Sequence, residues 1–414
     1  MVPDNDDTLA DVLVVGAGPA GACLAADLAA AGVQVTLIDR LADLNNVAFS
    51  SAAIPQATID RFALPQEVVA ATWSGWHLLG PGGSERRWRS EVPLGAVLDF
   101  GRLRFWLAEN AQEQGATVLL GTRALAWQAS GSEVALTVAT GTGQKRLLRG
   151  RWLIDATGSS RQLIGASQQP LPEPLVSGLG VEWLIAVDHA VWRRWSDQLA
   201  FFLGSDWVPQ GYGWIFPMAA PRLKVGVCRL NDAEGSQPAL APLLARLLER
   251  QGLTGAEVLD RHGGRISSTI HRRERHQQGR LLGLGDAVST ANLLGGEGIR
   301  HALLSAKVLA PKLLRTIRQE HQGRRAIRLW PFRHDPLAAY PKDLRRQLGW
   351  RWPLSGRLAR RTWLGLKDQG SDQRLEILLK GLERQPAQTL SSLLFDYRFE
   401  RYGLRALPDL LGLR

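Results

Sequence analysis

Cysteine is scarce in this sequence: Cys23 and Cys228 are the only two among 414 residues. Two thiols so far apart exclude the disulfide framework of a small secreted domain, and no cysteines or histidines have metal-ligand spacing. We therefore expect no bound metal and a reducing compartment, which indicates the cytoplasm.

Long apolar runs are also missing. No stretch reaches the roughly 20 apolar residues with which a helix crosses a bilayer, and residues 1–10 are acidic and polar, unlike a secretory signal. We find neither internal repeats nor low-complexity segments. These absences predict a soluble protein, or one that lies on a membrane surface.

The net charge of +11 is unevenly distributed along the chain. Residues 321–414 hold 19 lysines and arginines against 9 aspartates and glutamates, a net charge of +10. This region is helical by composition, and residues 354–366 combine arginine, leucine and tryptophan as interfacial helices do, which favours peripheral membrane contact. The alternative is that these arginines form the solvated face of a helix covering the core. No nucleic-acid recognition motif accompanies the charge, so we expect no nucleic-acid partner.

The most informative segment is the glycine-rich stretch Gly16–Gly21. An apolar strand pattern precedes it, an alanine-rich helix pattern follows it, and a second strand pattern ends in Asp39. This order is typical of a dinucleotide-binding unit. Gly16 makes the tight turn, Gly18 lets the backbone approach a pyrophosphate, and Gly21 lets the helix pack on the strand. The free N–H groups at the helix start bind phosphates, and Asp39 is placed to accept hydrogen bonds from a ribose.

Two further motifs follow along the chain. Residues 151–161 read as a strand that ends in Asp155 and a turn of small residues. Residues 280–287 read as a strand that enters Gly285 and Asp286, and the glycine-rich stretch Gly295–Gly298 then begins a long apolar helix.

Taken in order, the three motifs resemble the FAD-dependent group that contains aromatic hydroxylases, flavin halogenases, lycopene cyclases and geranylgeranyl reductases. The resemblance covers roughly residues 10–315 and implies FAD as the cofactor. It implies that Asp286 contacts the ribityl chain and that the helix start after Gly295 faces the flavin pyrimidine edge. We interpret Glu297 as a capping residue and His301 as a residue that faces packing or solvent.

An aromatic motif narrows the resemblance. Residues 209–217 match PxxYxWxFP, which is similar to the motif lining the isoprenoid cavity of geranylgeranyl reductases. Alternation along a strand places Tyr212, Trp214 and Phe216 on one face, as an aromatic wall over the flavin. These three residues and Pro217 are the predicted substrate-binding residues. The alternative is an aromatic core strand.

Two features depart from the reductases. Residues 45–55 contain no cysteine where the reductases commonly carry Cys-Gly-Gly, and the helix that usually opens with Asp-Arg reads Asp99-Phe100 here. We expect Arg102, or alternatively Arg104, to supply the missing cation. The predicted cofactor-binding residues are Gly16, Gly18, Pro19, Ala20, Gly21, Asp39, Arg40, Arg102, Asp155, Gly158, Gly285, Asp286, Gly295, Gly296, Gly298 and Ile299.

The length predicts more than one lobe, because single cores stop growing at roughly 250–300 residues. We predict an α/β fold, α+β overall, with a discontinuous Rossmann-type FAD-binding domain, an antiparallel-sheet substrate domain and a helical C-terminal tail. The predicted FAD-binding domain comprises residues 8–71, 93–175 and 266–320. The substrate domain comprises residues 72–92 and 176–265, and the basic helical region is 321–414.

The predicted function is an FAD-dependent oxidoreductase that reduces C=C bonds of an isoprenoid or similarly apolar substrate. NADPH or ferredoxin would supply the electrons transiently, because no second glycine-rich nucleotide motif occurs in a helix context. Tyr212 is the candidate proton donor. The alternatives are a lycopene-cyclase-like flavoenzyme, an FAD-dependent monooxygenase, and a flavoprotein that only carries an apolar pigment. The sequence leaves the oligomeric state open.

Overall fold

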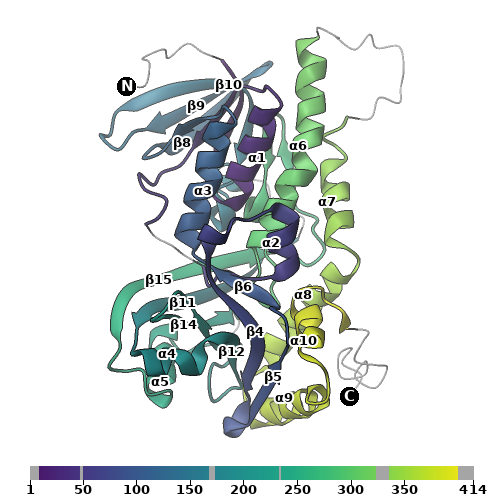
Figure 1. The fold of residues 1–414 in the computed structure, drawn as a ribbon. Coiled ribbons are helices and arrows are strands. Elements are labelled where there is room, and N and C mark those ends of the chain that lie inside the picture. The colour runs from purple at the N-terminus through teal and green to yellow at the C-terminus, as the bar shows by residue number, and fades with distance from the viewer. Residues whose placement is uncertain (1–8, 47–49, 167–172, 233–234, 323–334, 400–414) are drawn as a thin grey trace.

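A parallel sheet forms the upper lobe in Figure 1, in a computed structural model that describes residues 9–46, 50–166, 173–232, 235–322 and 335–399. Its strand order is β16-β17-β10-β1-β2-β7, and all neighbours except β16 and β17 run parallel. The hairpin of β8 and β9 extends the sheet from the first half of β10. The strands are β1 (Ala10–Val15), β2 (Val35–Ile38), β7 (Thr117–Leu119), β8 (Arg123–Ser130), β9 (Glu133–Ala139), β10 (Lys145–Asp155), β16 (Gln277–Gln278) and β17 (Leu281–Gly283).

Helix α1 is buried on most of its surface, which explains its alanine-rich sequence. It lies between α3 and α6 against the parallel sheet (Figure 1), and its alanines let three helices approach closely. The helices of this lobe are α1 (Pro19–Ala30), α2 (Gln56–Phe62), α3 (Phe100–Glu113) and α6 (Ile299–His321). Short 3₁₀ turns connect the elements: η1 (Gln66–Val68), η2 (Pro81–Gly83), η3 (Gly158–Ser160), η4 (Ile164–Ala166) and η5 (Gly285–Val288).

The second sheet forms the lower lobe and has the order β15-β11-β14-β13-β12-β4-β6-β3, with β5 paired to β4. Its pairs are antiparallel except β12 with β4. Helices α4 (His189–Trp195) and α5 (Leu240–Arg250) cover one face of this sheet. The strands are β3 (Ala53–Pro55), β4 (Val69–Leu79), β5 (Glu85–Arg89), β6 (Gly95–Leu98), β11 (Val176–Ala186), β12 (Asp197–Leu203), β13 (Gly211–Pro217), β14 (Arg222–Leu230) and β15 (Glu257–Ser268).

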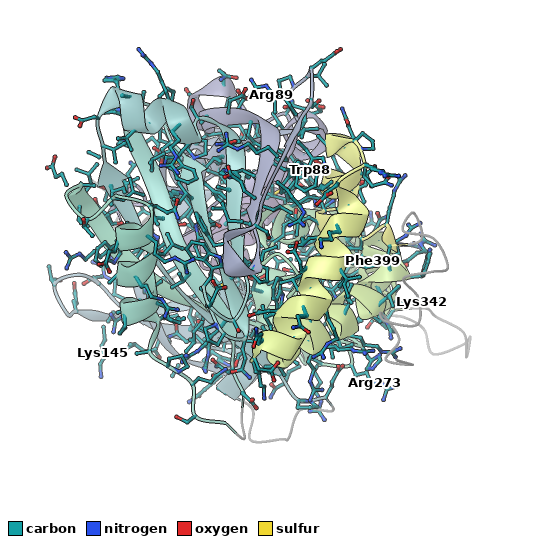
Figure 2. The ribbon with its side chains drawn as sticks, turned by 90° about the horizontal axis from the view of Figure 1, so that it is seen from below. Trp88, Arg89, Lys145, Arg273, Lys342 and Phe399 are labelled. Atoms are coloured by element: carbon teal, nitrogen blue, oxygen red, sulfur yellow. The ribbon has the colours of Figure 1, made fainter. Side chains whose placement is uncertain are left out.

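The C-terminal helices run down one side of both lobes. Helix α7 (Tyr340–Leu348) packs on α6, and α8 (Arg351–Gly365), α9 (Gln369–Leu382) and α10 (Ala387–Leu394) cover the other face of the second sheet. Figure 2 shows Trp88 of β5 beside the yellow C-terminal helices. The indole N–H of Trp88 donates a hydrogen bond to the carbonyl oxygen of Leu382 at 3.3 Å. The buried Arg86 forms ion pairs with Glu376 and Glu383 of this helical region at 2.5 and 2.7 Å.

This cover agrees with one of the two interpretations of the basic tail. Trp352, Ala359 and Trp363 of α8 are buried, whereas Arg357 and Arg360 on its other side are exposed. The arginines therefore lie on the exposed face of a helix whose other face covers the core. Among the described helices, none has the length and apolar character that crossing a bilayer requires.

The predicted fold class is confirmed, with a discontinuous nucleotide lobe, a mostly antiparallel sheet and a helical C-terminal region. The second sheet crosses the predicted domain limits at the ends of β4 and β15 and at two short strands. Strands β3 and β6 belong to the second sheet, although they lie inside the predicted ranges 8–71 and 93–175. The long strand β4 pairs with β6, and β6 pairs with β3. Strands this short carry no periodicity that could have shown this.

Candidate cofactor and substrate site

One cavity of about 600 Å³ collects residues from both sheets and from the C-terminal helices. In the upper lobe its lining comes from the carboxyl ends of β1, β2 and β10 and from the turn after β17. Its apolar lining comes from the face of the second sheet and from Trp363, Leu394 and Phe395. The two predicted parts of the site therefore meet in one space.

The glycine turn after β1 has one open position and two crowded ones. A Cβ on Gly16, whose φ is +108°, would lie 2.3 Å from the carbonyl oxygen of Ala156, and one on Gly21 would lie 2.0 Å from that of Gly16. A Cβ on Gly18 would meet nothing within 4 Å. Helix α1 starts there with no side-chain cap. Gly18 therefore leaves room over helix N–H groups that can bind an anion.

Asp39 is fixed beside this turn at the end of β2. Its carboxylate accepts hydrogen bonds from the backbone N–H of Ala17 at 2.8 Å and of Leu41 at 2.9 Å, and it lines the cavity with the exposed Arg40. Each carboxylate oxygen keeps a lone pair for a hydroxyl donor such as a ribose.

Arg104, rather than Arg102, lies at the cavity. Arg102 is exposed and pairs with Asp99, the cap of α3, at 3.8 Å, so the preferred expectation for Arg102 is corrected. Arg104 is buried and lines the cavity; burial lowers the pKa of its guanidinium, and the charge of Asp39 opposes this effect. Two residues that are two positions apart on a helix point in directions about 200° apart around its axis, so only one of the two arginines can face the cavity.

Asp155 does not line the cavity, which corrects another expected contact. Its buried carboxylate accepts hydrogen bonds from the N–H and hydroxyl of Thr157 and from the N–H groups of Leu163 and Ile164, at 2.6 to 3.0 Å. It thereby shapes the turn that brings Gly158, with φ +69° and open space around it, to the cavity.

Asp286 lines the cavity in the η5 turn after β17. It accepts a hydrogen bond from the Thr290 hydroxyl at 2.7 Å. Burial raises the pKa of this carboxyl group, and the Thr290 hydrogen bond and the charges of Arg161 and Arg272 oppose the rise. Its neighbour Gly285 lies outside the lining, and a Cβ there would come within 2.8 Å of the Cβ of Ala20 on α1.

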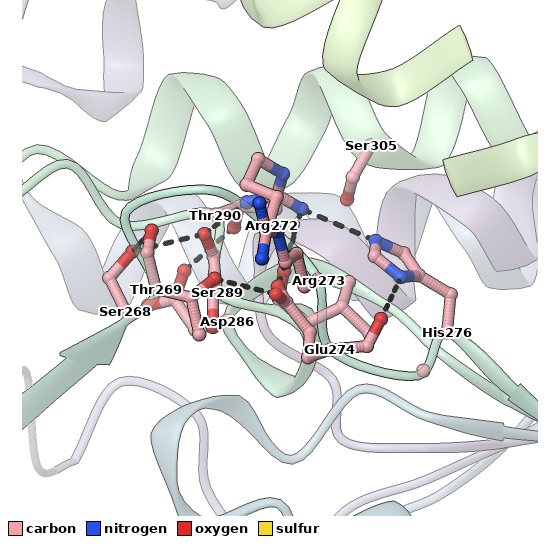
Figure 3. Close-up of polar contacts among 12 residues, drawn as sticks. Ser268, Thr269, Arg272, Arg273, Glu274, His276, Asp286, Ser289, Thr290 and Ser305 are labelled. Atoms are coloured by element: carbon pink, nitrogen blue, oxygen red, sulfur yellow. Dashed lines mark hydrogen bonds and ion pairs between the residues drawn. The ribbon is translucent and has the colours of Figure 1, made fainter. Parts of the chain in front are cut away.

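A buried polar network holds the turn that carries Asp286 (Figure 3). Arg272 donates to the carbonyl oxygen of Ser289 and, at 2.7 Å, to that of Val288, while Arg161 donates to the Ser289 hydroxyl. The Ser268 hydroxyl donates to the same Ser289 carbonyl at 3.2 Å. No sequence motif predicts this network, because a run of arginines does not show which of them is buried.

The start of α6 borders the cavity through Gly295, Gly296, Gly298 and Ile299. Helix α6 has no side-chain cap, so the expected capping role of Glu297 is wrong. Glu297 instead forms a two-fold ion pair with Arg300 at 2.7 and 2.8 Å, because burial of its carboxylate requires a partner charge. Burial raises the pKa of Glu297, and Arg300 opposes this.

His301, on the first turn of α6, is a packing residue. It is buried with its ring edge-on to Trp352, at a centroid distance of 4.9 Å. This agrees with the interpretation from the sequence.

The three aromatic residues of β13 lie on one face and line the cavity. The ring centroids of Tyr212 and Trp214 are 5.9 Å apart, and those of Trp214 and Phe216 are 6.3 Å apart. Phe201 of β12 contacts this wall, and the ring centroids of Trp363 on α8 and Tyr212 are 5.0 Å apart. Pro217 lies outside the lining. The sequence could not show that a tryptophan more than a hundred residues away completes the wall.

Tyr212 joins the two halves of the site. A Cβ placed on Gly296 would lie 3.4 Å from its hydroxyl oxygen, so the wall meets the start of α6 here. Burial raises the pKa of the Tyr212 hydroxyl well above 10. The polar side chains of Glu182 and His262 also line the cavity, and no sequence motif indicated either of them.

The donor set suits a dinucleotide that carries a flavin. An open glycine at an uncapped helix start fits a diphosphate, and the carboxylates of Asp39 and Asp286 fit ribose and ribityl hydroxyl groups. The uncapped start of α6 fits the electron-rich edge of a reduced flavin.

Comparisons with known proteins agree with this geometry. Residues 9–63 match the model of an FAD binding domain. The chain is 27% identical to a digeranylgeranylglycerophospholipid reductase of Haloferax volcanii, over 92% of this chain and 91% of the relative. It is 28% identical to a menaquinone reductase of Mycobacterium tuberculosis, over 78% of this chain and 79% of the relative. A geranylgeranyl bacteriochlorophyll reductase-like protein of Thermoplasma acidophilum has a similar fold, with a TM-score of 0.76, 20% identity, and coverage of 97% and 99% of the two chains.

Proposed function

Because the chain is an FAD-dependent oxidoreductase similar to geranylgeranyl reductases, we propose that it reduces C=C bonds in an isoprenoid or similarly apolar chain. The observation that carries this proposal is the aromatic wall of Tyr212, Trp214 and Phe216, in one cavity with the nucleotide-binding turn. A polyene has no polar groups to recognise, so shape and apolar contact must hold it.

The residues proposed to hold FAD come from the start of α1, the end of β2, the turn after β17 and helix α3. The diphosphate would lie over Gly18 at the start of α1, the adenosine ribose at Asp39 and the ribityl chain at Asp286. Arg104 would neutralise part of the phosphate charge. When bound and reduced, FAD supplies the hydride.

The residues of the second sheet orient the substrate and exclude water. Trp214, Phe216 and Phe201 line the cavity on the side of the second sheet, and Trp363 and Phe395 line it on the side of the C-terminal helices. Tyr212 is the proton donor expected from the sequence. Since burial raises the pKa of its hydroxyl, Tyr212 is a weak acid here and better suited to orientation.

The electron donor that fits is a transient one, NADPH or a ferredoxin. The glycine-rich turn before α1 is the one whose sequence context is typical of a dinucleotide-binding unit, and we assign this turn and the cavity beside it to FAD. A donor would therefore dock, reduce the flavin and leave. Anaerobic mixing of the FAD-loaded protein with each donor, followed by flavin absorbance, decides between them.

Peripheral membrane contact is proposed for the exposed face of α8. Arg357, Arg360 and Arg361 surround a surface hollow that also contains Ile270 and Leu364. Cationic side chains beside apolar ones suit an anionic lipid surface, where an apolar substrate would be available.

The decisive experiment is anaerobic turnover of a geranylgeranyl compound by the FAD-loaded, reduced protein, with product mass as the readout. Reduction adds two hydrogens for each bond, cyclisation leaves the mass unchanged, and oxygenation adds one oxygen. Oxygen consumption coupled to substrate would contradict the reductase proposal, as would a purified protein that stays colourless when FAD is supplied.

A further inference from the structure

A row of polar side chains crosses the second sheet at the aromatic wall. In the register of the sheet, Trp214 on β13 is opposite Gly226 on β14, Gly226 is opposite Glu182 on β11, and Glu182 is opposite His262 on β15. The four positions lie side by side on neighbouring strands and on the cavity face. Trp214, Glu182 and His262 all line the cavity.

Because Gly226 has no side chain, Trp214 and Glu182 can contact each other across β14. A Cβ on Gly226 would lie 2.2 Å from the indole ring of Trp214, so the indole occupies the space above β14. It thereby reaches Glu182, to which its N–H donates a hydrogen bond of 2.7 Å. Any larger residue at position 226 would block this contact.

The row continues from Glu182 toward solvent. The other carboxylate oxygen of Glu182 lies 3.0 Å from Nε2 of His262, and Nδ1 of His262 lies 3.0 Å from the carboxylate of Asp260. The exposed fraction of the side chain rises along the row, from 4% in Glu182 to 10% in His262 and 43% in Asp260. A continuous series of proton-exchanging groups therefore joins the cavity wall to water.

The charges around the row favour a protonated imidazole. Burial by itself lowers the pKa of His262, but the hydrogen bonds and charges of Glu182 and Asp260 outweigh burial and raise it above its ordinary value. On β14, the buried Lys224 donates to the carbonyl oxygen of Ser50 at 2.5 Å. Burial lowers the pKa of its ammonium group, and the charges of Glu182 and Asp99 oppose this effect. The imidazolium can transfer its proton to the Glu182 carboxylate, which gives a neutral imidazole and a neutral carboxyl group, so the transfer leaves no isolated buried charge.

We propose that Glu182 is the proton donor to the substrate and that His262 and Asp260 resupply it from solvent. This inference rests on the proposed reductase function. Saturating one C=C bond breaks its π bond and forms two C–H bonds. One hydrogen arrives as a hydride, with both electrons, from the reduced flavin. The other arrives as the proton of the Glu182 carboxyl group, which regains a proton from His262, and His262 regains one from water beside Asp260.

The first test needs no turnover. In the FAD-loaded protein with ¹⁵N-labelled histidine, pH titration by NMR gives the pKa of His262, with His262→Gln as the assignment control. We expect a value above the ordinary 6.5 that falls in Glu182→Gln. Glu257→Gln, an exposed carboxylate on the same strand β15, should leave it unchanged. A His262 pKa that does not respond to Glu182→Gln would overturn the proposal.

The second test measures flavin reoxidation in a single anaerobic turnover with a geranylgeranyl compound. Glu182→Gln should slow reoxidation about 100-fold or more, the usual contribution of a positioned acid. Chemical reduction of the flavin should stay as in the wild type, and the circular dichroism spectrum should show that the variant is folded. His262→Gln should slow the reaction less and remove the loss of rate as pH rises through the His262 pKa.

The outcomes separate the two proposals. A wild-type protein that no polyene reoxidises contradicts the reductase function, while the titration still reports on the row. A wild-type protein that turns over with Glu182→Gln within about 3-fold of its rate overturns the proton donor alone. If Glu182→Gln does not fold, the flavin reoxidation rate of His262→Gln, at the more exposed position, decides instead. A rate within about 3-fold of the wild type would then overturn the proton donor.

Discussion

At the scale of single residues, the free space around each glycine decides whether it can contact the ligand or is needed for packing. Gly16 and Gly21 are pressed against backbone, whereas Gly18 faces open space at the start of α1. The same motif therefore contains two packing positions and one binding position, and single substitutions can separate them.

Gly18→Ala should weaken FAD binding without weakening the fold. The backbone of Gly18 is extended, with φ −78°, and its Cβ would meet nothing within 4 Å, so the flavin-free protein should lose no more than about 0.5 kcal/mol. The added methyl group occupies the space proposed for the diphosphate, and we expect about a 10-fold or larger rise in the FAD dissociation constant. Flavin fluorescence titration and urea unfolding measure the two effects. Gly21→Ala, the matched control, should destabilise the fold itself.

Gly226→Ala should destabilise the protein and break the contact between Trp214 and Glu182. The new methyl group would overlap the indole ring, and overpacking of this kind costs about 1–3 kcal/mol. Urea unfolding measures the cost, and the NMR signal of the Trp214 indole N–H reports the contact. Gly255→Ala, with open space around its Cβ, should leave stability almost unchanged. Equal stability of the two variants would show that the indole does not cross β14.

At the scale of elements, the C-terminal helices have two different faces. The buried face of α8 closes the cavity through Trp363, and the opposite face carries Arg357, Arg360 and Arg361 into solvent. Composition alone is compatible with a membrane helix or a covering helix, and packing shows that covering the core uses only one face. The second face stays available for a surface.

Reversing the charges of α8 should abolish binding to anionic vesicles. Each cation near such a surface contributes about 1 kcal/mol, so Arg357→Glu, Arg360→Glu and Arg361→Glu together should reduce binding to phosphatidylglycerol vesicles about 100-fold or more. Cosedimentation measures binding, with phosphatidylcholine vesicles as the neutral reference. The control combines Lys145→Glu, Arg315→Glu and Arg318→Glu, three exposed cations elsewhere. Equal loss in both triple variants would indicate a response to net charge only.

At the scale of the whole molecule, the site exists only because two lobes and a helical cover meet. Arg161, Arg272 and Asp286 come from three separate parts of the chain, and the turn that carries Asp286 is held from behind by the two arginines. Groups buried in that network link the stability of the molecule to pH.

The protein should lose stability as pH falls from 6.5 to about 4, in part through His276. Burial, helped by the charge of Arg272, lowers the pKa of His276 from 6.5 to about 4. In this window the unfolded chain binds a proton that the native protein does not, so acidification favours unfolding, by up to about 3 kcal/mol at the acid end. Urea unfolding at several pH values should show a flatter profile in His276→Gln. His189→Gln, at an exposed position, should follow the wild type.

The sequence by itself determined the nucleotide lobe, because its signals are local. A glycine turn needs particular residues at fixed spacing, and Asp39 follows its strand directly, so the order of strand, turn, helix and acid could be predicted without contacts. Alternation likewise placed Tyr212, Trp214 and Phe216 on one face of β13.

Only the tertiary structure decided what depends on register and burial. The orientation of α3 places Arg104, and not Arg102, at the cavity. The hydrogen bonds and ion pairs of Asp155 and Glu297 give these two residues structural roles. Trp363 lines the cavity although it belongs to the distant C-terminal region. The row from Trp214 to His262 crosses four strands: β13 and β14 follow one another in the sequence, whereas β11 and β15 lie farther away. Pairing register, which no local pattern encodes, brings these side chains together.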